Sequence, residues 1–348
     1  MIILCRDDLT PEQRERVRAA VAAWGFPFWE RDAGARAVFE TAPAAAPMRC
    51  EIERMAGVER VFAGEPGMHL ASRDHRSEPT RVAVGDVVLG GDATVVIAGP
   101  CAVEGREVAL EIARAVRAAG ATMLRGGAFK PRTSPYDFRG LGAEGLEILA
   151  EARAETGLPV VTEVLDTRDV AAVVEQADML QVGSRNMHNF ALLAEVGRTR
   201  KPVLLKRGMS ATVDELLTSA EYVLAGGNEQ VVLCERGIRT FEPATRNTLD
   251  LAAVPLLAER THLPVVVDPS HASGRRTLVP ALARAAAAAG AAGVMMEVHV
   301  RPDEARCDAK QAILPAELAA IVRELRAIDR ALRPAPAPDR TPQPEAVP

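Results

Sequence analysis

The chain has 348 residues, which is enough for one large domain and a small one. Hydrophobic residues make up 48% and charged residues 26%, as in ordinary soluble globular proteins, and no uncharged apolar run reaches the roughly 18–20 residues of a membrane span. The formal net charge of −5 offers no general attraction to nucleic acid, and the five scattered cysteines without a C-x-x-C pair argue for a reducing, cytoplasmic setting and against a disulfide framework.

Residues 1–70 predict a small ferredoxin-like α+β domain. An apolar strand at 1–5 precedes a helix with Thr10 as its N-cap, Pro11 at the first helical position and Gln13 as the capping-box partner. The remaining elements complete a βαββαβ order, with strands at 26–30, 35–41 and 58–63 and a helix near 45–55.

Two further segments flank the larger domain. Residues 71–92 predict a polar linker at 72–80 and a β-hairpin over 81–89 that turns at Gly85 and Asp86. Residues 334–348 repeat Pro and Ala, so they cannot bury a core and are expected to form a disordered tail.

Residues 93–333 alternate short apolar runs with helical patterns such as 107–119 and 213–225, which predicts a (β/α)8 TIM barrel. The predicted strands are 94–98, 122–125, 159–163, 179–182, 203–206, 231–235, 264–268 and 293–297. An open doubly wound sheet is the alternative. It would not be expected to place polar clusters after nearly every strand, as this sequence does.

Because the carboxyl ends of barrel strands meet at one mouth, the residues that end each strand are candidates for function. Six of them are basic: Arg125, Lys130, Arg132, Arg185, Lys206 and Arg236. Arg forks and Lys point charges suit phosphate and carboxylate oxygens. The alternative is that each is merely solvated. Their convergence favours ligands with several negative charges, including more than one phosphate.

A second set could hold a metal: Cys101, His271, Glu297 and Asp308. One sulfur, one nitrogen and two carboxylates suit a borderline divalent cation such as Mn, Fe, Co or Zn. On the residues alone, a buried structural cysteine, a core histidine and two solvated carboxylates remain an equal alternative.

Five segments of the larger domain resemble the type I 3-deoxy-D-arabino-heptulosonate 7-phosphate (DAHP) synthases. They are 97–104 (IAGPCAVE), 124–136 (LRGGAFKPRTSPY), 205–208 (LKRG), 233–241 (LCERGIRTF) and 267–271 (VDPSH). The resemblance spans about residues 81–330, and the N-terminal part fits the subgroup with a ferredoxin-like domain. It implies a metal-dependent condensation of phosphoenolpyruvate with erythrose 4-phosphate and water, the first step of the shikimate pathway.

The resemblance also implies that the reaction uses no organic cofactor, and it implies a role for each of the following residues. The metal ligands are Cys101, His271, Glu297 and Asp308. Phosphoenolpyruvate is bound by Arg125, Lys130, Ser184, Arg185, Lys206 and Arg236. The phosphate of erythrose 4-phosphate is bound by Arg132, Thr133 and Ser134. By the resemblance, Glu163 is expected near the attacking water, and we expect Lys130 to pass a proton to the new alkoxide, directly or through water.

Two other activities stay open. One is 3-deoxy-D-manno-octulosonate 8-phosphate synthesis from arabinose 5-phosphate, although Pro131-Arg132-Thr133 implies the four-carbon aldehyde. The other is a metal aldolase that never uses phosphoenolpyruvate. Four departures from the family pattern remove no ligand: His188, Val300 and Cys307 stand where Gln, Pro and Ser are usual, and Ala309-Lys310 follows Asp308 where Gly is common. The Cys307 thiol is expected to compete for a soft metal.

By the same resemblance, the small domain is expected to bind an aromatic amino acid, Tyr or Phe, as an allosteric effector. An oligomerisation or stability module is the alternative for residues 1–70. We expect a cytoplasmic homodimer or homotetramer.

Overall fold

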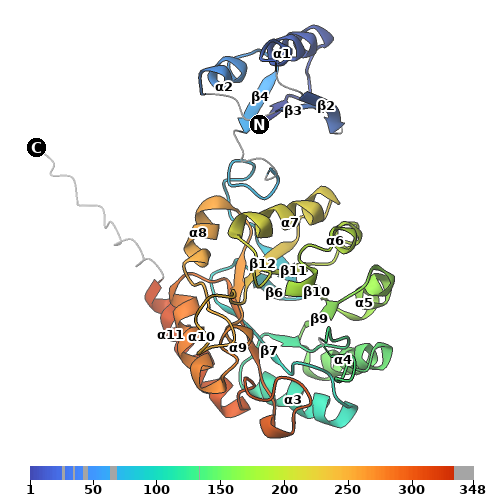
Figure 1. Cartoon of the computed structure of the whole chain (residues 1–348), viewed down its shortest axis with the longest axis vertical. Helices are drawn as coiled ribbons and strands as arrows, with labels where there is room; N and C mark the ends of the chain where they lie inside the picture. Colours follow the sequence, from blue (N-terminus) through green and yellow to red (C-terminus); the bar gives the residue numbers. More distant parts are fainter. Residues whose placement is uncertain (26–27, 34–35, 42–45, 63–68, 133, 333–348) are drawn as a thin grey trace, which may run out of the picture.

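The computed structural model describes residues 1–25, 28–33, 36–41, 46–62, 69–132 and 134–332 (Figure 1). The predicted tail at 334–348 and the predicted site residue Thr133 lie outside these ranges. None of the helices in the described ranges is both long enough and apolar enough to cross a membrane.

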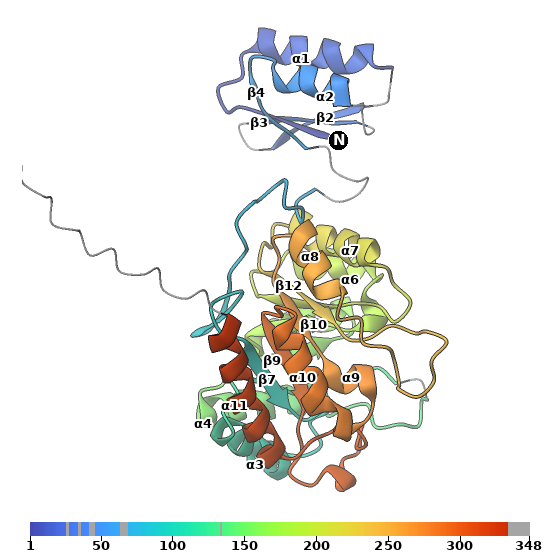
Figure 2. The same cartoon turned by 90° about the vertical axis from the view of Figure 1, so that its left-hand side faces the viewer.

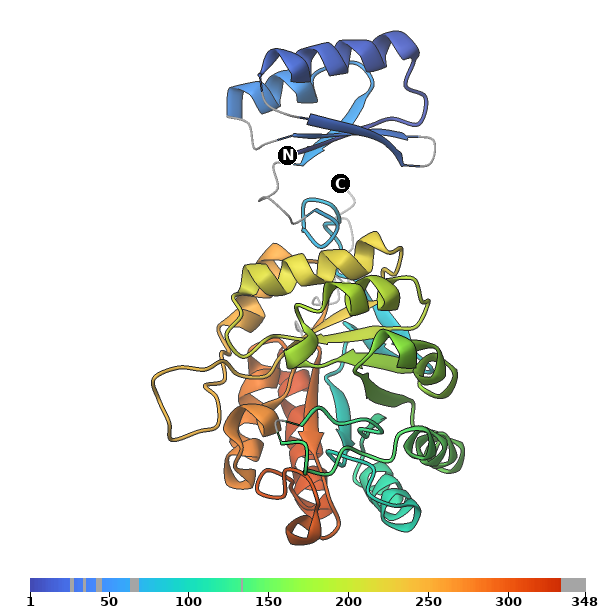
Figure 3. The ribbon, with the colours of Figure 1, turned by 45° about the vertical axis from the view of Figure 1, so that its right-hand side comes forward.

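The N-terminal part has the predicted βαββαβ order. Its elements are β1 (Ile2–Cys5), α1 (Pro11–Ala23), β2 (Phe28–Ala33), β3 (Arg36–Thr41), α2 (Ala46–Glu53) and β4 (Val58–Phe62). The described strands form an antiparallel sheet in the order β2-β3-β1-β4, and Figures 2 and 3 show α1 and α2 together on one face of it. This arrangement confirms the prediction of a small antiparallel α+β domain.

Helix α1 begins as its sequence predicts. Thr10 Oγ1 accepts a hydrogen bond from the Gln13 amide at 3.2 Å, and Gln13 Oε1 accepts one from the Thr10 amide at 2.9 Å. This capping box satisfies two of the amides that a helix leaves unpaired at its start. Val17 and Val21, one turn apart, are buried against the sheet.

The larger part is a closed parallel barrel. In the described residues its strands are β7 (Val95–Gly99), β8 (Met123–Arg125), β9 (Val160–Val164), β10 (Met179–Val182), β11 (Val203–Lys206), β12 (Val231–Glu235), β13 (Val265–Val267) and β14 (Gly293–Glu297). The last strand pairs with the first, from Gly293 opposite Val95 to Glu297 opposite Gly99. An open sheet has free edge strands, so this pairing excludes the doubly wound alternative and confirms the barrel.

Helices surround the barrel (Figure 1). They are α3 (Arg106–Ala118), α4 (Ala143–Thr156), α5 (Val170–Gln176), α6 (Phe190–Gly197), α7 (Val213–Ala225), α8 (Ala253–Arg260), α9 (Pro269–Ser273), α10 (Val279–Ala288) and α11 (Pro315–Leu332). Helix α11 packs against both α10 and α3 and so closes the outer layer (Figure 2).

Each barrel strand is apolar on both faces, as a sheet covered by helices requires. In β7, Val96 and Ala98 face the helices, whereas Val95 and Ile97 face the barrel interior. The hairpin β5 (Val82–Val84) and β6 (Val87–Leu89) adds Val82, Val84 and Leu89 to this interior cluster. The hairpin therefore closes the barrel below, at the amino ends of the strands.

The segment before the hairpin is attached to the barrel. The backbone amides of residues 69, 70 and 71 donate to the Glu221 carboxylate on α7 at 2.6, 3.0 and 2.7 Å. Ser72 forms a β-bridge with Thr261, and Thr80 Oγ1 lies 2.7 Å from His262 Nδ1. The polar stretch predicted as a linker is thus hydrogen-bonded to the barrel at both of its ends.

Candidate active site

The polar floor of the site follows from the alternation along the strands. Met123, Val161 and Leu204 face the barrel interior, so the next inward positions, two residues on, are the last that point inward before each loop. Those positions are polar in seven strands of the described barrel, and all are buried: Arg125, Glu163, Gln181, Lys206, Arg236, Asp268 and Glu297. Charge therefore collects at the carboxyl end of the barrel.

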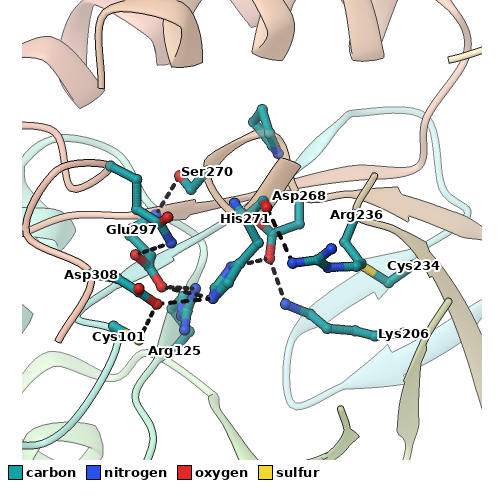
Figure 4. A network of polar contacts seen from close by, with 12 residues as sticks. Cys101, Arg125, Lys206, Cys234, Arg236, Asp268, Ser270, His271, Glu297 and Asp308 are labelled. Atoms are coloured by element: carbon teal, nitrogen blue, oxygen red, sulfur yellow. Dashed lines mark hydrogen bonds and ion pairs between the residues drawn. The ribbon is translucent and has the colours of Figure 1, made fainter. Parts of the chain in front are cut away.

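The predicted metal ligands come together there. Cys101 follows β7, His271 lies on α9, Glu297 ends β14 and Asp308 lies in the loop before α11. One ligand atom from each of these residues, which we call the metal-ligand set, lies within 4.8 Å of all the others (Figure 4).

The orientation of His271 suits a metal ligand. Its Nδ1 lies 2.8 Å from Asp268 Oδ2, which turns Nε2 toward Glu297 Oε1 at 3.1 Å and Asp308 Oδ2 at 3.7 Å. Burial lowers the pKa of His271 to about 3, so the ring is neutral and Nε2 has a free lone pair. A carboxylate on the outer nitrogen is the usual partner of a metal-binding histidine.

The unsatisfied atoms of the set also fit a cation. Glu297 Oε1 is buried and makes no hydrogen bond within the described residues. Burial raises the pKa of Glu297 well above its ordinary range, and a hydrogen bond with Cys307, together with burial, does the same to the Cys101 thiol. Crowded, buried anionic groups are costly unless a cation balances them. The donors therefore fit a divalent ion such as Mn, Fe, Co or Zn.

The six predicted cations line a cavity of about 160 Å³ beside His271 and Asp308. We call Arg125, Lys130, Arg132, Arg185, Lys206 and Arg236 the cation set. Several of its members have a carboxylate partner, which sequence reasoning did not identify. The described pairs are Arg125–Glu297 at 3.3 Å, Lys130–Glu163 at 3.9 Å, Arg132–Asp137 at 3.1 Å and Lys206–Asp268 at 2.5 Å.

Arg185 and Arg236 have no carboxylate within 4 Å among the described residues. Arg236 is buried and donates only to the carbonyls of Gly237 and His271, at 3.2 and 3.1 Å. Nε and Nη1 of the buried Arg125 make no hydrogen bond in the described structure. The cavity thus keeps donor capacity that an anionic ligand would use.

Lys130 and Glu163 face the same cavity. Burial alone would lower the pKa of Lys130, but the neighbouring Cys101 and Glu163 raise it above its ordinary value, so the ammonium stays charged. Gly183 makes room for Glu163, because a Cβ at that position would fall 1.9 Å from Glu163 Oε1. Ser184 also lines the cavity.

The loop after β8 places the two described members of the predicted aldose-phosphate set, Arg132 and Ser134, differently. Arg132 lines the cavity, and its Nη1 lies 2.8 Å from Cys307 Sγ. Ser134 is not among the lining residues, and its Oγ accepts the Tyr136 amide at 3.3 Å.

Of the unusual residues, Cys307 is inside the site, with its Sγ 3.1 Å from Cys101 Sγ. His188 is exposed and packs edge-on against Phe190. Val300 packs against the core between the barrel strands and the helices.

Three residues that sequence reasoning did not single out complete the site. Asp268 holds both Lys206 and His271, and its place in the Asp-Pro-Ser-His motif was a usable signal. Arg246 lines the cavity and donates to Asp308 Oδ1 at 3.2 Å, and Gln311 donates to Glu297 Oε2 at 2.7 Å. Both lie in loops, where strand alternation gives no signal.

The chain is similar over most of its length to known enzymes. It is 49% identical over 282 residues to a phospho-2-dehydro-3-deoxyheptonate aldolase of Thermotoga maritima, which covers 81% of this chain and 83% of the relative. The crystal structure of that DAHP synthase matches 95% of this chain and 97% of its own at a TM-score of 0.77 and 43% identity.

A second group is more distant. A 2-dehydro-3-deoxyphosphooctonate aldolase of Magnetococcus marinus is 35% identical over 272 residues, which covers 72% of this chain and 93% of the relative.

Residues 70–332 match the family described as DAHP synthetase I, a stretch that holds every described residue of the metal-ligand and cation sets. The chain therefore belongs to the DAHP synthetase I family.

Proposed function

We propose that this protein condenses phosphoenolpyruvate with D-erythrose 4-phosphate and water to DAHP and inorganic phosphate. One observation carries the proposal: the cation set and a metal-ligand set face the same cavity at the carboxyl end of the barrel. The Thermotoga maritima relative, whose name states the heptonate activity, is more similar than the octonate relative, at 49% against 35% identity.

The metal-ligand set would hold one divalent cation, Mn, Fe, Co or Zn. Bound there, the ion would supply Lewis acidity to the aldehyde oxygen of the aldose. The protein's own part is to present neutral His271 and the deprotonated forms of its other three donors.

Phosphoenolpyruvate would occupy the inner part of the cavity. Its phosphate and carboxylate would be held by Arg125, Lys130, Ser184, Arg185, Lys206 and Arg236. Two Arg125 nitrogens make no hydrogen bond, and Arg236 has no carboxylate within 4 Å among the described residues; both observations support this assignment. Arg132, Thr133 and Ser134 would hold the phosphate of the aldose, with Arg132 at the cavity wall.

The protein's chemical work is orientation and proton handling. C3 of phosphoenolpyruvate attacks the aldehyde carbon, water adds at C2, and the resulting hemiketal phosphate loses inorganic phosphate by C–O cleavage. Lys130 Nζ, charged in its buried position, would donate a proton to the new alkoxide. Glu163 Oε2, 3.9 Å from that nitrogen, would orient the attacking water. Holding two anions in contact supplies most of the remaining rate enhancement.

A two-substrate assay tests the proposal. Phosphate release should require phosphoenolpyruvate, stop on thorough chelation and return with Mn, and erythrose 4-phosphate should be preferred over arabinose 5-phosphate. A preference for arabinose 5-phosphate would favour the octulosonate activity. Product formation without phosphoenolpyruvate would favour a simple metal aldolase.

The N-terminal α+β part is the proposed regulatory domain, with Tyr or Phe as effector, in a cytoplasmic homodimer or homotetramer. Deletion of residues 1–70 should abolish inhibition by these amino acids and keep catalysis. Aggregation of the shortened protein would instead favour an assembly or stability role.

A further inference from the structure

The two carboxylates of the metal-ligand set each point one oxygen toward the cluster and the other away from it. Asp308 Oδ2 lies 3.3 Å from Cys101 Sγ and 3.7 Å from His271 Nε2. Glu297 Oε1 lies 3.1 Å from the same ring nitrogen. The outward oxygens, Asp308 Oδ1 and Glu297 Oε2, are therefore left for partners outside the cluster.

Arg246 and Gln311 join these outward oxygens into one bridge. Gln311 Nε2 donates to Glu297 Oε2 at 2.7 Å, and Arg246 Nη1 donates to Gln311 Oε1 at 3.0 Å and to Asp308 Oδ1 at 3.2 Å. A glutamine amide has one donor end and one acceptor end, so the carboxylate on one side and the guanidinium on the other fix its orientation. Gln311 is 2% exposed, which keeps water from competing for either end.

The backbone sets both ends of the bridge. Asp308 has φ of 54°, the one positive φ outside glycine in the described residues, in the left-handed region that few residues other than glycine, asparagine and aspartate adopt. The backbone N–H of Gln311 donates to the backbone carbonyl of Asp308 at 3.1 Å and closes the turn that holds both residues. At the other end, Gly274 leaves space for Arg246, because a Cβ there would lie 2.7 Å from Arg246 Cβ.

We propose that Arg246 and Gln311 are positioning residues for the metal site. They hold Glu297 and Asp308 at one separation, so that each offers an oxygen to the same ion. The inference rests on the proposed function, since it presupposes that the metal-ligand set binds a divalent cation. Outer hydrogen-bond partners of metal ligands are typically worth about 10–100-fold in metal affinity.

The test compares metal binding by full-length, metal-stripped proteins. Calorimetric titration with Mn²⁺ should give a Kd raised about 10–100-fold in Arg246→Met and in Gln311→Leu. The double variant should be no weaker than the weaker single variant by more than about twofold, because both changes break the same bridge. The visible absorption of Co²⁺ bound to the Cys101 thiolate should also shift, since it reports the coordination geometry.

Lys310→Met is the matched control, since Lys310 is exposed and its loss removes a positive charge beside Gln311. Its Kd for Mn²⁺ should stay within about twofold of the unaltered protein. If the unaltered protein binds no Mn²⁺, the proposed metal site is wrong. If it binds and both single variants bind equally well, the bridge is wrong and the metal site stands. Arg246 is partly exposed, so its variant carries the test if Gln311→Leu does not fold.

Discussion

The two ends of the barrel interior use the same inward-facing strand positions for opposite purposes. At the amino ends, Val95, Val232 and Val266 pack with the hairpin residue Leu89 in a fully apolar cluster. At the carboxyl ends, the positions that continue the same alternation carry buried charges. Stability and chemistry thus occupy separate layers of one core. Substitutions in the apolar layer should therefore change stability and leave catalysis nearly unchanged.

We call the charged layer at the carboxyl ends of the strands the upper layer and the apolar layer at their amino ends the lower layer. Loss of a metal ligand should have the largest effect on the upper layer. His271→Ala removes the neutral nitrogen of the metal-ligand set, so kcat should fall at least about 1000-fold, the equivalent of several kcal/mol of Lewis acid catalysis. Metal content after dialysis and the rate of phosphate release measure this effect. His188→Ala, at an exposed position, is the control. A His271 variant with full metal content and full rate would refute the ligand assignment.

The lower layer should respond in stability alone. Leu89→Ala opens a cavity in the closed end of the barrel, so the free energy of unfolding should fall by about 2–5 kcal/mol with kcat/KM unchanged. Chemical denaturation measures the first quantity. Val88→Ala, whose side chain is 40% exposed on the other face of the hairpin, should change stability by less than about 0.5 kcal/mol. A large fall in kcat/KM for the Leu89 variant would show that the layers are coupled.

Within the upper layer, paired and unpaired cations should behave differently. Arg236→Met removes a buried cation without stranding a carboxylate, so KM for phosphoenolpyruvate should rise about 10–100-fold, and stability should fall by only about 1–3 kcal/mol because two backbone carbonyls lose a donor. Lys206→Met leaves buried Asp268 without its ammonium partner. It should therefore lower both the affinity for phosphoenolpyruvate and the unfolding free energy. Equal stability losses in the two variants would contradict this distinction.

The pH dependence of metal binding reports how many protons the metal ligands of the upper layer release. Because the pKa values of Cys101 and Glu297 are raised in the metal-free protein, an ion that binds their deprotonated forms must compete with protons for both groups. Apparent Mn²⁺ affinity should therefore rise with pH, by up to about tenfold per pH unit for each displaced proton. Calorimetry in buffers of different ionisation enthalpy counts the released protons. Affinity independent of pH would mean that the donors are already deprotonated.

The barrel was predictable because its signal is local. Short apolar runs alternate with helical patterns along the chain, and the predicted strand ends differ from the observed ones by a residue at most, as at β9, which ends at Val164 and not at residue 163. The cations were predictable for the same reason, since strand ends such as Lys206 must meet at one mouth.

What sequence reasoning missed depends on loop conformation. Arg246 and Gln311 are 65 residues apart, and Gln311 follows a turn in which Asp308 adopts a left-handed backbone conformation. The carboxylate partners of the cation set were missed as well, because pairing across the barrel depends on side-chain geometry that strand spacing does not give. Ser134 is the opposite case. It belongs to a motif that implied a substrate contact, but it does not line the cavity.

The hairpin has a consequence for the modular history of such chains. It lies before the first barrel strand in sequence, yet Val82, Val84 and Leu89 belong to the barrel's inner core. A recombination event that exchanged the N-terminal part would therefore keep an intact barrel only if the junction fell ahead of residue 82. A junction between the hairpin and β7 would remove the base of the core and leave its apolar interior open to water.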